Sequence, residues 1–314
     1  MTIWIGLMFL TLMLMLLLGY PVAFTLGAVA LLYGSIFLGV DFFNLLPLQI
    51  WGVMTNFTLL AVPLFILMGI ILDKSGLAED LLETMGLLFG RVRGGLAISV
   101  VLVGALLAAT TGVVGATVVT MGVIALPTML KRNYSPQLAT GTIAAAGTLG
   151  QIIPPSIILI LLGDVIGVPV GRLFIGAVIP GILLITLFLI YISIFAWMKP
   201  EVGPALSEVE GGDGLLKKVI FTLFPPLILV LGVLGSIFFG IASPTESAAI
   251  GAIGAMLLAA AHRRLTLQNL QDAMQQTTRL TSMVFLILIG ATAFGLVFRG
   301  MGGASLVSEL ILNL

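Results

Sequence analysis

Two uncharged stretches of the chain contain residues whose oxygen atoms can bind a small cation. The first covers residues 94–130, with Thr-Thr-Gly-Val-Val-Gly at positions 110–115, and the second covers residues 133–163, with Gly-Thr-Leu-Gly-Gln-Ile-Ile-Pro-Pro-Ser at positions 147–156. Glycine and proline interrupt helices and so free main-chain carbonyls beside the hydroxyl groups. Neutral oxygens of this kind suit Na⁺, whereas the N-terminal ends of interrupted helices suit a carboxylate. The candidate ligands for Na⁺ and substrate are Thr110, Thr111, Gly112, Gly115, Gly147, Thr148, Gly150, Pro154, Pro155 and Ser156.

Close helix packing is the competing interpretation of the same residues. Glycine and threonine in membrane helices usually mark places where two helices approach closely, and a single proline usually marks a kink. Packing explains positions 110–115 well when they are taken alone. It explains Pro154 and Pro155 less well, because we expect a double proline to end a continuous helix. Two breaks in neighbouring segments favour the ion and substrate site of a secondary transporter.

The composition predicts a membrane protein embedded in a lipid bilayer. The chain of 314 residues is 60% hydrophobic and 8% charged, with a mean hydropathy of +1.27, whereas soluble domains are about a quarter charged. The net charge is zero, and nothing indicates nucleic-acid binding. There is no cysteine for a disulfide or a thiolate metal site, and the only histidine, His262, is expected to be solvated. We therefore expect no cofactor, only Na⁺ as a coupling ion.

Apolar segments long enough to cross a bilayer predict the transmembrane helices. The expected spans are 2–18, 22–39, 57–72, 172–198, 219–240, 244–261 and 280–298. Paired basic residues should face the cytoplasm, and this places the N-terminus in the periplasm. Residues 94–130 then form a re-entrant hairpin from the cytoplasm, with two spans joined by an outer turn as the alternative. Residues 137–163 form one discontinuous helix. Segments 76–93 and 265–279 are amphipathic and are predicted to lie in the membrane interface, with ordinary loops as the alternative.

The order of these elements is repeated with inverted topology. Residues 1–198 form a first repeat, residues 199–218 a cytoplasmic loop, and residues 219–314 the beginning of a second repeat. The predicted fold is an all-α polytopic membrane protein with inverted repeats, as in alternating-access transporters. By this symmetry a second hairpin should follow residues 299–303. Because the sequence stops at Leu314, we expect it to be truncated at its C-terminus.

Several longer motifs carry a family resemblance. They are residues 112–122, 126–127, 131–134 and 147–156, supported by residues 59–65, 91–95 and 243–249. With them the chain, over essentially its whole length, resembles the large membrane subunit of TRAP (tripartite ATP-independent periplasmic) transporters of the DctM type. The sequence departs from the family pattern at Thr110 and Thr111, where serines are common, and it lacks the family's second hairpin and second Pro-Pro break.

The resemblance implies a function and its partners. It implies a Na⁺-driven importer of organic acids in the bacterial inner membrane, working as an elevator with two opposed hairpins. It further implies a small four-helix membrane subunit and a periplasmic substrate-binding protein, and it places half of the Na⁺ and substrate site at residues 110–115 and 147–156. A Na⁺/dicarboxylate carrier that needs no binding protein and a non-transporting membrane scaffold remain open. An enzyme is not expected, because no Ser/His, di-Asp or metal constellation is present.

Overall fold

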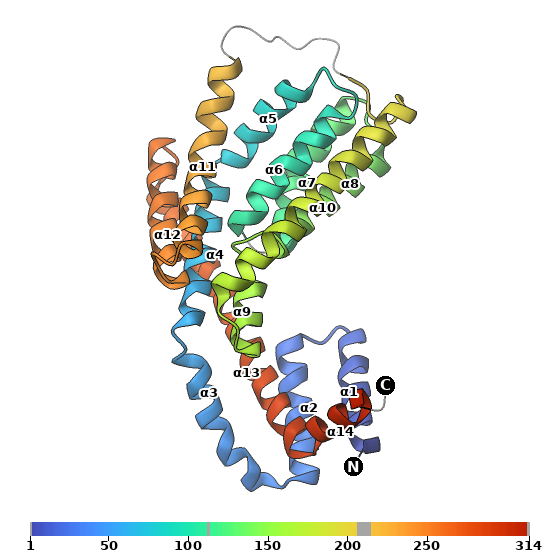
Figure 1. Ribbon diagram of the computed structural model, residues 1–314, viewed down its shortest axis with the longest axis vertical. Coiled ribbons are helices and arrows are strands. Elements are labelled where there is room, and N and C mark those ends of the chain that lie inside the picture. The colour runs from blue at the N-terminus through green and yellow to red at the C-terminus, as the bar shows by residue number, and fades with distance from the viewer. Residues whose placement is uncertain (1, 112–113, 206–214, 313–314) are drawn as a thin grey trace. The chain divides into compact units, whose positions relative to one another are not determined.

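The computed structural model describes residues 2–111, 114–205 and 215–312, and the regular structure of these residues is entirely helical (Figure 1). The prediction of an all-α fold is therefore confirmed. The helices are α1 (Thr2–Leu17), α2 (Val22–Phe37), η1 (Val40–Leu45), α3 (Leu46–Met54), η2 (Thr58–Leu60), α4 (Ala61–Lys74), α5 (Leu77–Phe89), α6 (Gly95–Thr111), α7 (Val114–Lys131), α8 (Pro136–Thr148), η3 (Leu149–Gln151), α9 (Ile157–Ile166), α10 (Val170–Met198), α11 (Leu215–Phe238), α12 (Pro244–Ala261), α13 (Leu267–Gly300) and α14 (Gly303–Leu312), where η marks a 3₁₀ helix.

Several of these helices can cross a membrane by length and composition. Among the described residues, α10, Val219–Phe238 of α11, α12 and α13 each qualify alone. The segments 40–54 and 58–74 qualify together and are bent by 56° at the break between them. These findings support a multi-pass membrane protein. The assignment of each predicted span, the inverted repeat and the elevator arrangement stay predictions.

The helices form two compact units that do not coincide with the predicted repeats. The first contains residues 1–56 and 278–314, and the second contains residues 57–277. In the first unit, Met8 of α1, Val29 of α2 and Val297 of α13 belong to one buried core. The Thr11 and Tyr33 hydroxyls hydrogen-bond each other at 2.9 Å and so join α1 to α2.

The second unit contains both segments that carry candidate ligands. Helices α4 and α12 pack together, and the Thr245 hydroxyl donates to the Phe57 carbonyl at 3.1 Å. Helices α6, α7, α8 and α10 lie side by side (Figure 1). Their shared core includes Val100, Met121 and Leu149, each fully buried. This bundle holds the interrupted helix against the two helices on either side of residues 112–113.

Two helices of the second unit begin at serines for local reasons. The Ser135 hydroxyl accepts a hydrogen bond from Leu138 N–H at 3.2 Å at the start of α8. At the start of α12, Ser243 and Glu246 form a reciprocal capping box, which satisfies main-chain donors that a helix start leaves free. A proline follows each serine, at the position where its missing N–H costs nothing.

The structure differs from the sequence-based expectations in several ways. The segments predicted as an interfacial helix over 265–279 and a span over 280–298 are one continuous helix, α13. No glycine or proline lies between Leu267 and Ile289, so nothing in the sequence ends the helix there. The structure also adds η1 and α3 in residues 40–54, which the map left without an element.

The third difference concerns the proline rule. Helix α11 contains Pro225 and Pro226 within its length, so the expectation that a double proline always ends a helix is wrong. Proline removes a donor from the carbonyl four residues earlier, and membrane helices tolerate the loss when other groups satisfy that carbonyl. The interruption at Pro154 and Pro155 therefore depends on its surroundings as well as on the prolines themselves.

Candidate functional site

The second candidate segment is an interrupted helix. Helix α8 ends at Thr148, the short helix η3 follows, and α9 begins only at Ile157. Residues 152–156 between η3 and α9 are not helical, and the Pro154–Pro155 peptide bond is cis. Pro154, Pro155 and Ser156 are buried. The interruption thus lies where the sequence places it, with the C-terminal end of one helix facing the start of another across five residues.

The two hydroxyl groups of this interruption are already oriented by the main chain. The Thr148 hydroxyl donates to the Ala145 carbonyl at 2.7 Å, and the Ser156 hydroxyl donates to the Gln151 carbonyl at 2.8 Å. Each hydroxyl thereby uses its only proton and keeps lone pairs that can accept a hydrogen bond or bind a cation. Thr148 is exposed, whereas Ser156 is fully buried. Thr148 is therefore the more accessible of the two oxygens.

The start of α9 offers the opposite polarity. Ser156 occupies the N-cap position of α9, but its side chain makes no capping hydrogen bond there. The first N–H groups of a helix carry partial positive charge and attract anions when no side chain caps them. The same interruption therefore combines hydroxyl oxygens at the end of α8 with an uncapped positive end at α9, and residues 133–163 contain no charged side chain.

The first candidate segment lies between two helices. Thr110 and Thr111 form the last residues of α6, and α7 begins at Val114. Gly112 lies outside the described residues. Gly115 is in the first turn of α7, is exposed, and has open space where a side chain would begin. The described residues of the predicted tip thus belong to α6 and α7, and the re-entrant hairpin stays a prediction.

Small residues bring the two segments together. A Cβ atom on Gly104 of α6 would lie 2.7 Å from the Ala146 Cβ of α8. A Cβ atom on Gly147 would overlap the Val118 side chain of α7 and lie 3.1 Å from the Val118 Cα and N atoms. The short helix η3 also contacts both α6 and α7. At Gly147 the packing interpretation therefore has direct geometric support, and this packing sets the interruption beside both α6 and α7.

The opposite ends of α6 and α7 are held by main-chain and tyrosine contacts. The Leu96 N–H in the first turn of α6 donates to the Tyr134 hydroxyl at 3.1 Å. The Gly94 N–H donates to the Gly203 carbonyl at 2.8 Å, and the Ser135 N–H donates to the Val202 carbonyl at 2.9 Å. Burial raises the pKa of Tyr134, and the hydrogen bond from Leu96 opposes this rise. The protonated hydroxyl thus serves as a fixed acceptor at this end of α6 and α7, the base of the predicted hairpin.

The substitution Tyr134→Phe tests this anchor. It leaves the buried Leu96 N–H without its acceptor, and such a loss costs about 1–3 kcal/mol. We expect a lower midpoint of thermal unfolding for the purified protein in detergent. The control is Tyr20→Phe, because Tyr20 is 55% exposed and its hydroxyl can be replaced by solvent. Equal midpoints for the two variants would show that the Tyr134 hydroxyl does not stabilise the base.

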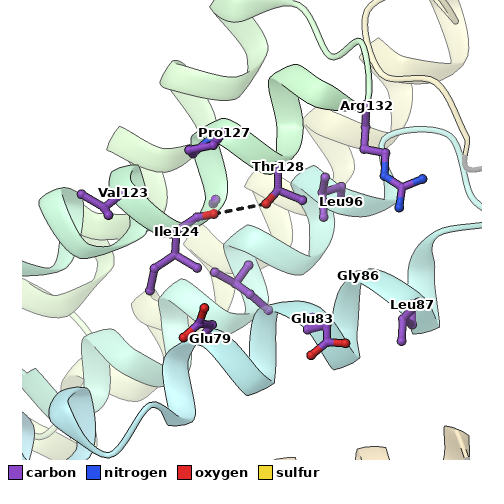
Figure 2. A pocket seen from close by; sticks show the side chains of 12 residues that line it. Glu79, Glu83, Gly86, Leu87, Leu96, Val123, Ile124, Pro127, Thr128 and Arg132 are labelled. Carbon is purple, nitrogen blue, oxygen red and sulfur yellow. Dashed lines mark hydrogen bonds between the residues drawn. The ribbon is translucent and has the colours of Figure 1, made fainter.

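A cavity that the sequence did not reveal lies between α5 and α7. Its volume is about 600 Å³, and Figure 2 shows Glu79 and Glu83 on one wall and Thr128 and Arg132 on the other. The Thr128 hydroxyl donates to the Ile124 carbonyl at 3.3 Å. Charged side chains avoid hydrocarbon, so these walls indicate that this side of α5 and α7 meets water. The polar face of segment 76–93 was the only sign of this cavity in the sequence. The opposite wall is formed by α7, and its position beside α5 depends on how the helices pack.

Comparisons with known proteins agree with the residue motifs. The family model described as Tripartite ATP-independent periplasmic transporter, DctM component, matches residues 9–314. The C4-dicarboxylate TRAP transporter large permease protein DctM of Pseudomonas aeruginosa is 33% identical over 252 residues, which cover 79% of this chain and 58% of that protein. The sialic acid TRAP transporter large permease protein SiaM of Vibrio cholerae is 32% identical over 295 residues, covering 93% of this chain and 66% of that protein.

A third relative is named for another substrate. The ectoine TRAP transporter large permease protein TeaC of Halomonas elongata is 30% identical over 284 residues, covering 89% of this chain and 65% of that protein. The chain thus spans between 58% and 66% of the length of these three relatives. All three are named as transporter permeases and none as an enzyme. Because the family model covers nearly the whole sequence, the chain belongs to the DctM component family of tripartite ATP-independent periplasmic (TRAP) transporters.

Proposed function

We propose that the chain is the large membrane component of a Na⁺-driven transporter that imports an organic anion across the bacterial inner membrane. It receives the anion from a periplasmic binding protein and works with a small four-helix membrane subunit. The observation that carries the proposal is the packing of α8 and η3, the part of the interrupted helix before the prolines, against α6 and α7. Family membership supports the role in transport, and the names of the relatives, with three different substrates, leave the identity of the anion open.

The neutral chemistry of the site supports this choice of ligands. Oxygen atoms of hydroxyls and carbonyls at the C-terminal end of α8 attract a cation, because that end of a helix carries partial negative charge. The uncapped N-terminus of α9 attracts a carboxylate for the opposite reason. A cation and an anion bound on the two sides of one interruption stabilise each other by Coulomb attraction. Such mutual stabilisation couples Na⁺ binding to substrate binding.

Na⁺ binding is the step that can be tested without knowing the substrate. A ligand that binds only the folded protein raises its stability by about 2.7 kcal/mol at a concentration one hundred times its dissociation constant. We expect the midpoint of thermal unfolding to be higher in NaCl than in choline chloride at equal ionic strength. Thr148→Val should remove most of this difference, because it deletes the accessible hydroxyl at the interruption.

Thr140→Val is the matched control within α8. Thr140 is exposed, and its hydroxyl donates to the Pro136 carbonyl at 2.7 Å, as Thr148 does to Ala145. The two substitutions therefore remove the same group from the same helix, one near the interruption and one two turns away from it. We expect Thr140→Val to keep the response to Na⁺. Loss of the response in both variants, or in neither, would contradict a Na⁺ site that uses Thr148.

A further inference from the structure

Helices α8 and α10 of the second unit enclose an apolar groove. Its volume is about 640 Å³. One wall has small side chains and consists of Gly141, Thr142 and Ala145 of α8. The other wall is aromatic and consists of Phe188, Tyr191 and Phe195 of α10. Tyr191 is 62% exposed, and only 11% of the apolar window of α10 is buried. The groove therefore opens along a helix that presents most of its apolar length to its surroundings.

The aromatic wall ends in a cation. Tyr191, Phe195 and Lys199 follow one another at intervals of four residues, which places them on one face of α10 and its C-terminal extension. The Tyr191 and Phe195 rings are stacked, with centroids 5.7 Å apart and an interplanar angle of 8°. The Lys199 Nζ atom lies 5.7 Å from the centroid of the Phe195 ring. The aromatic wall of the groove thus ends beside the positively charged side chain of Lys199.

The same end of α10 carries residues typical of the membrane interface. Trp197, two residues from Phe195, is 74% exposed, and tryptophan and lysine together mark the boundary between hydrocarbon and water. On the other wall, the side chain of Gln137 lines the groove in the first turn of α8. The groove therefore has a polar end at the interface and an apolar course into the membrane.

Further positive charge surrounds this end. The hydrogen bonds from Gly94 to Gly203 and from Ser135 to Val202 join the segments 91–94, 131–135 and 199–203. These segments carry five basic residues and one carboxylate, which are Arg91, Arg93, Lys131, Arg132, Lys199 and Glu201. Basic clusters next to transmembrane helices attract anionic lipid headgroups. The positive charge of Lys199 beside the Phe195 ring is thus complementary to a phosphate, and the joined segments add net positive charge at this end of the unit.

We propose that this groove binds an anionic phospholipid, with its phosphate at Lys199 and one acyl chain along Phe195, Tyr191 and Phe188. A long apolar chain that ends in a negative group matches both the shape of the groove and the charge at its mouth. The chain would lie against α8 and reach Ala145, whose carbonyl accepts the Thr148 hydroxyl. A bound lipid would therefore support α8 one turn before its interruption.

The test compares lipids that differ in one property at a time. The purified 314-residue chain in detergent is mixed with phosphatidylglycerol, with phosphatidylcholine of identical acyl chains, or with glycerol 3-phosphate, which has no chain. Native mass spectrometry counts the retained molecules. We expect one retained phosphatidylglycerol per chain, a preference for it over phosphatidylcholine, and no displacement by glycerol 3-phosphate. Lys199→Gln should reduce the preference about five-fold, as expected for one basic residue near the headgroup.

Filling the groove gives a second and independent test. Gly141→Leu places a side chain in open space within the groove, and we expect retention of phosphatidylglycerol to fall at least ten-fold. Gly176→Leu is the matched control, because Gly176 of α10 is also exposed, also has open space around its Cβ position, and does not line the groove. Both variants should unfold at similar temperatures without added lipid.

Three results would overturn the proposal. Equal retention of phosphatidylglycerol and phosphatidylcholine by the unmodified chain would mean that the charge at Lys199 does not select the lipid. Retention of phosphatidylglycerol by Gly141→Leu at the level of Gly176→Leu would mean that the chain binds elsewhere. Displacement of the lipid by glycerol 3-phosphate would mean that the site recognises a phosphate group and that the groove does not hold the acyl chain.

Discussion

The substitution Gly147→Ala is expected to lower the midpoint of thermal unfolding, although alanine forms helices better than glycine. The gain in helix propensity is about 1 kcal/mol. The added methyl group would overlap the Val118 side chain and lie 3.1 Å from the Val118 main chain, which cannot move aside as a flexible side chain can. Overpacking of this kind costs about 1–3 kcal/mol. The net effect is therefore destabilising and pushes α8 away from α7.

Gly141→Ala is the matched control, because Gly141 lies in the same helix with open space around its Cβ position. There only the gain in helix propensity acts, and we expect the midpoint to rise. Both variants are compared by thermal unfolding in the same detergent. The Gly147→Ala protein should also show a weaker response to Na⁺, because the interruption loses its contact with α7. A rise in the midpoint for both variants would contradict the close contact between Gly147 and Val118.

The interruption of the helix could be predicted from the sequence because its causes are local. Proline and glycine act through their own backbone geometry, and the end of α8 at Thr148 and the start of α9 at Ile157 fall within the predicted segment. The helices on either side of the undescribed residues 112–113, α6 and α7, also fall within the predicted segment 94–130. What local signals cannot show is that α6, α7 and η3 lie together, since that depends on contacts such as Gly104 with Ala146.

The features missed by sequence analysis depend on residues far apart in the chain. Leu96 and Tyr134 are separated by 38 positions, and the walls of the groove come from α8 and α10. Pro225 and Pro226 show that a local signal alone does not predict an interruption. The same dipeptide that accompanies the interruption after α8 lies inside the continuous helix α11. At residues 149–156, a 3₁₀ turn and the hydrogen bond from the Ser156 hydroxyl to the Gln151 carbonyl accompany the prolines.

The double substitution Pro154→Ala with Pro155→Ala is expected to abolish the stabilisation by Na⁺. Without the prolines, nothing in the backbone chemistry of residues 152–156 opposes helix formation, and α8 and α9 can join through the interruption. Carbonyls that a joined helix would use for its own hydrogen bonds are then no longer available to a cation. The expected loss is the whole Na⁺-dependent term, about 2.7 kcal/mol at one hundred times the dissociation constant. Thermal unfolding in NaCl and in choline chloride measures it.

Pro225→Ala with Pro226→Ala is the control that separates this effect from a general effect of proline removal. Those prolines lie in α11, which is already a continuous helix, so their replacement should raise helix propensity and leave the response to Na⁺ unchanged. The comparison isolates the interruption, because both variants lose the same two side chains from the same compact unit. If the Pro154 and Pro155 variant kept its full response to Na⁺, the interruption would not be needed for cation binding. The glycines and prolines of residues 147–156 would then serve helix packing alone.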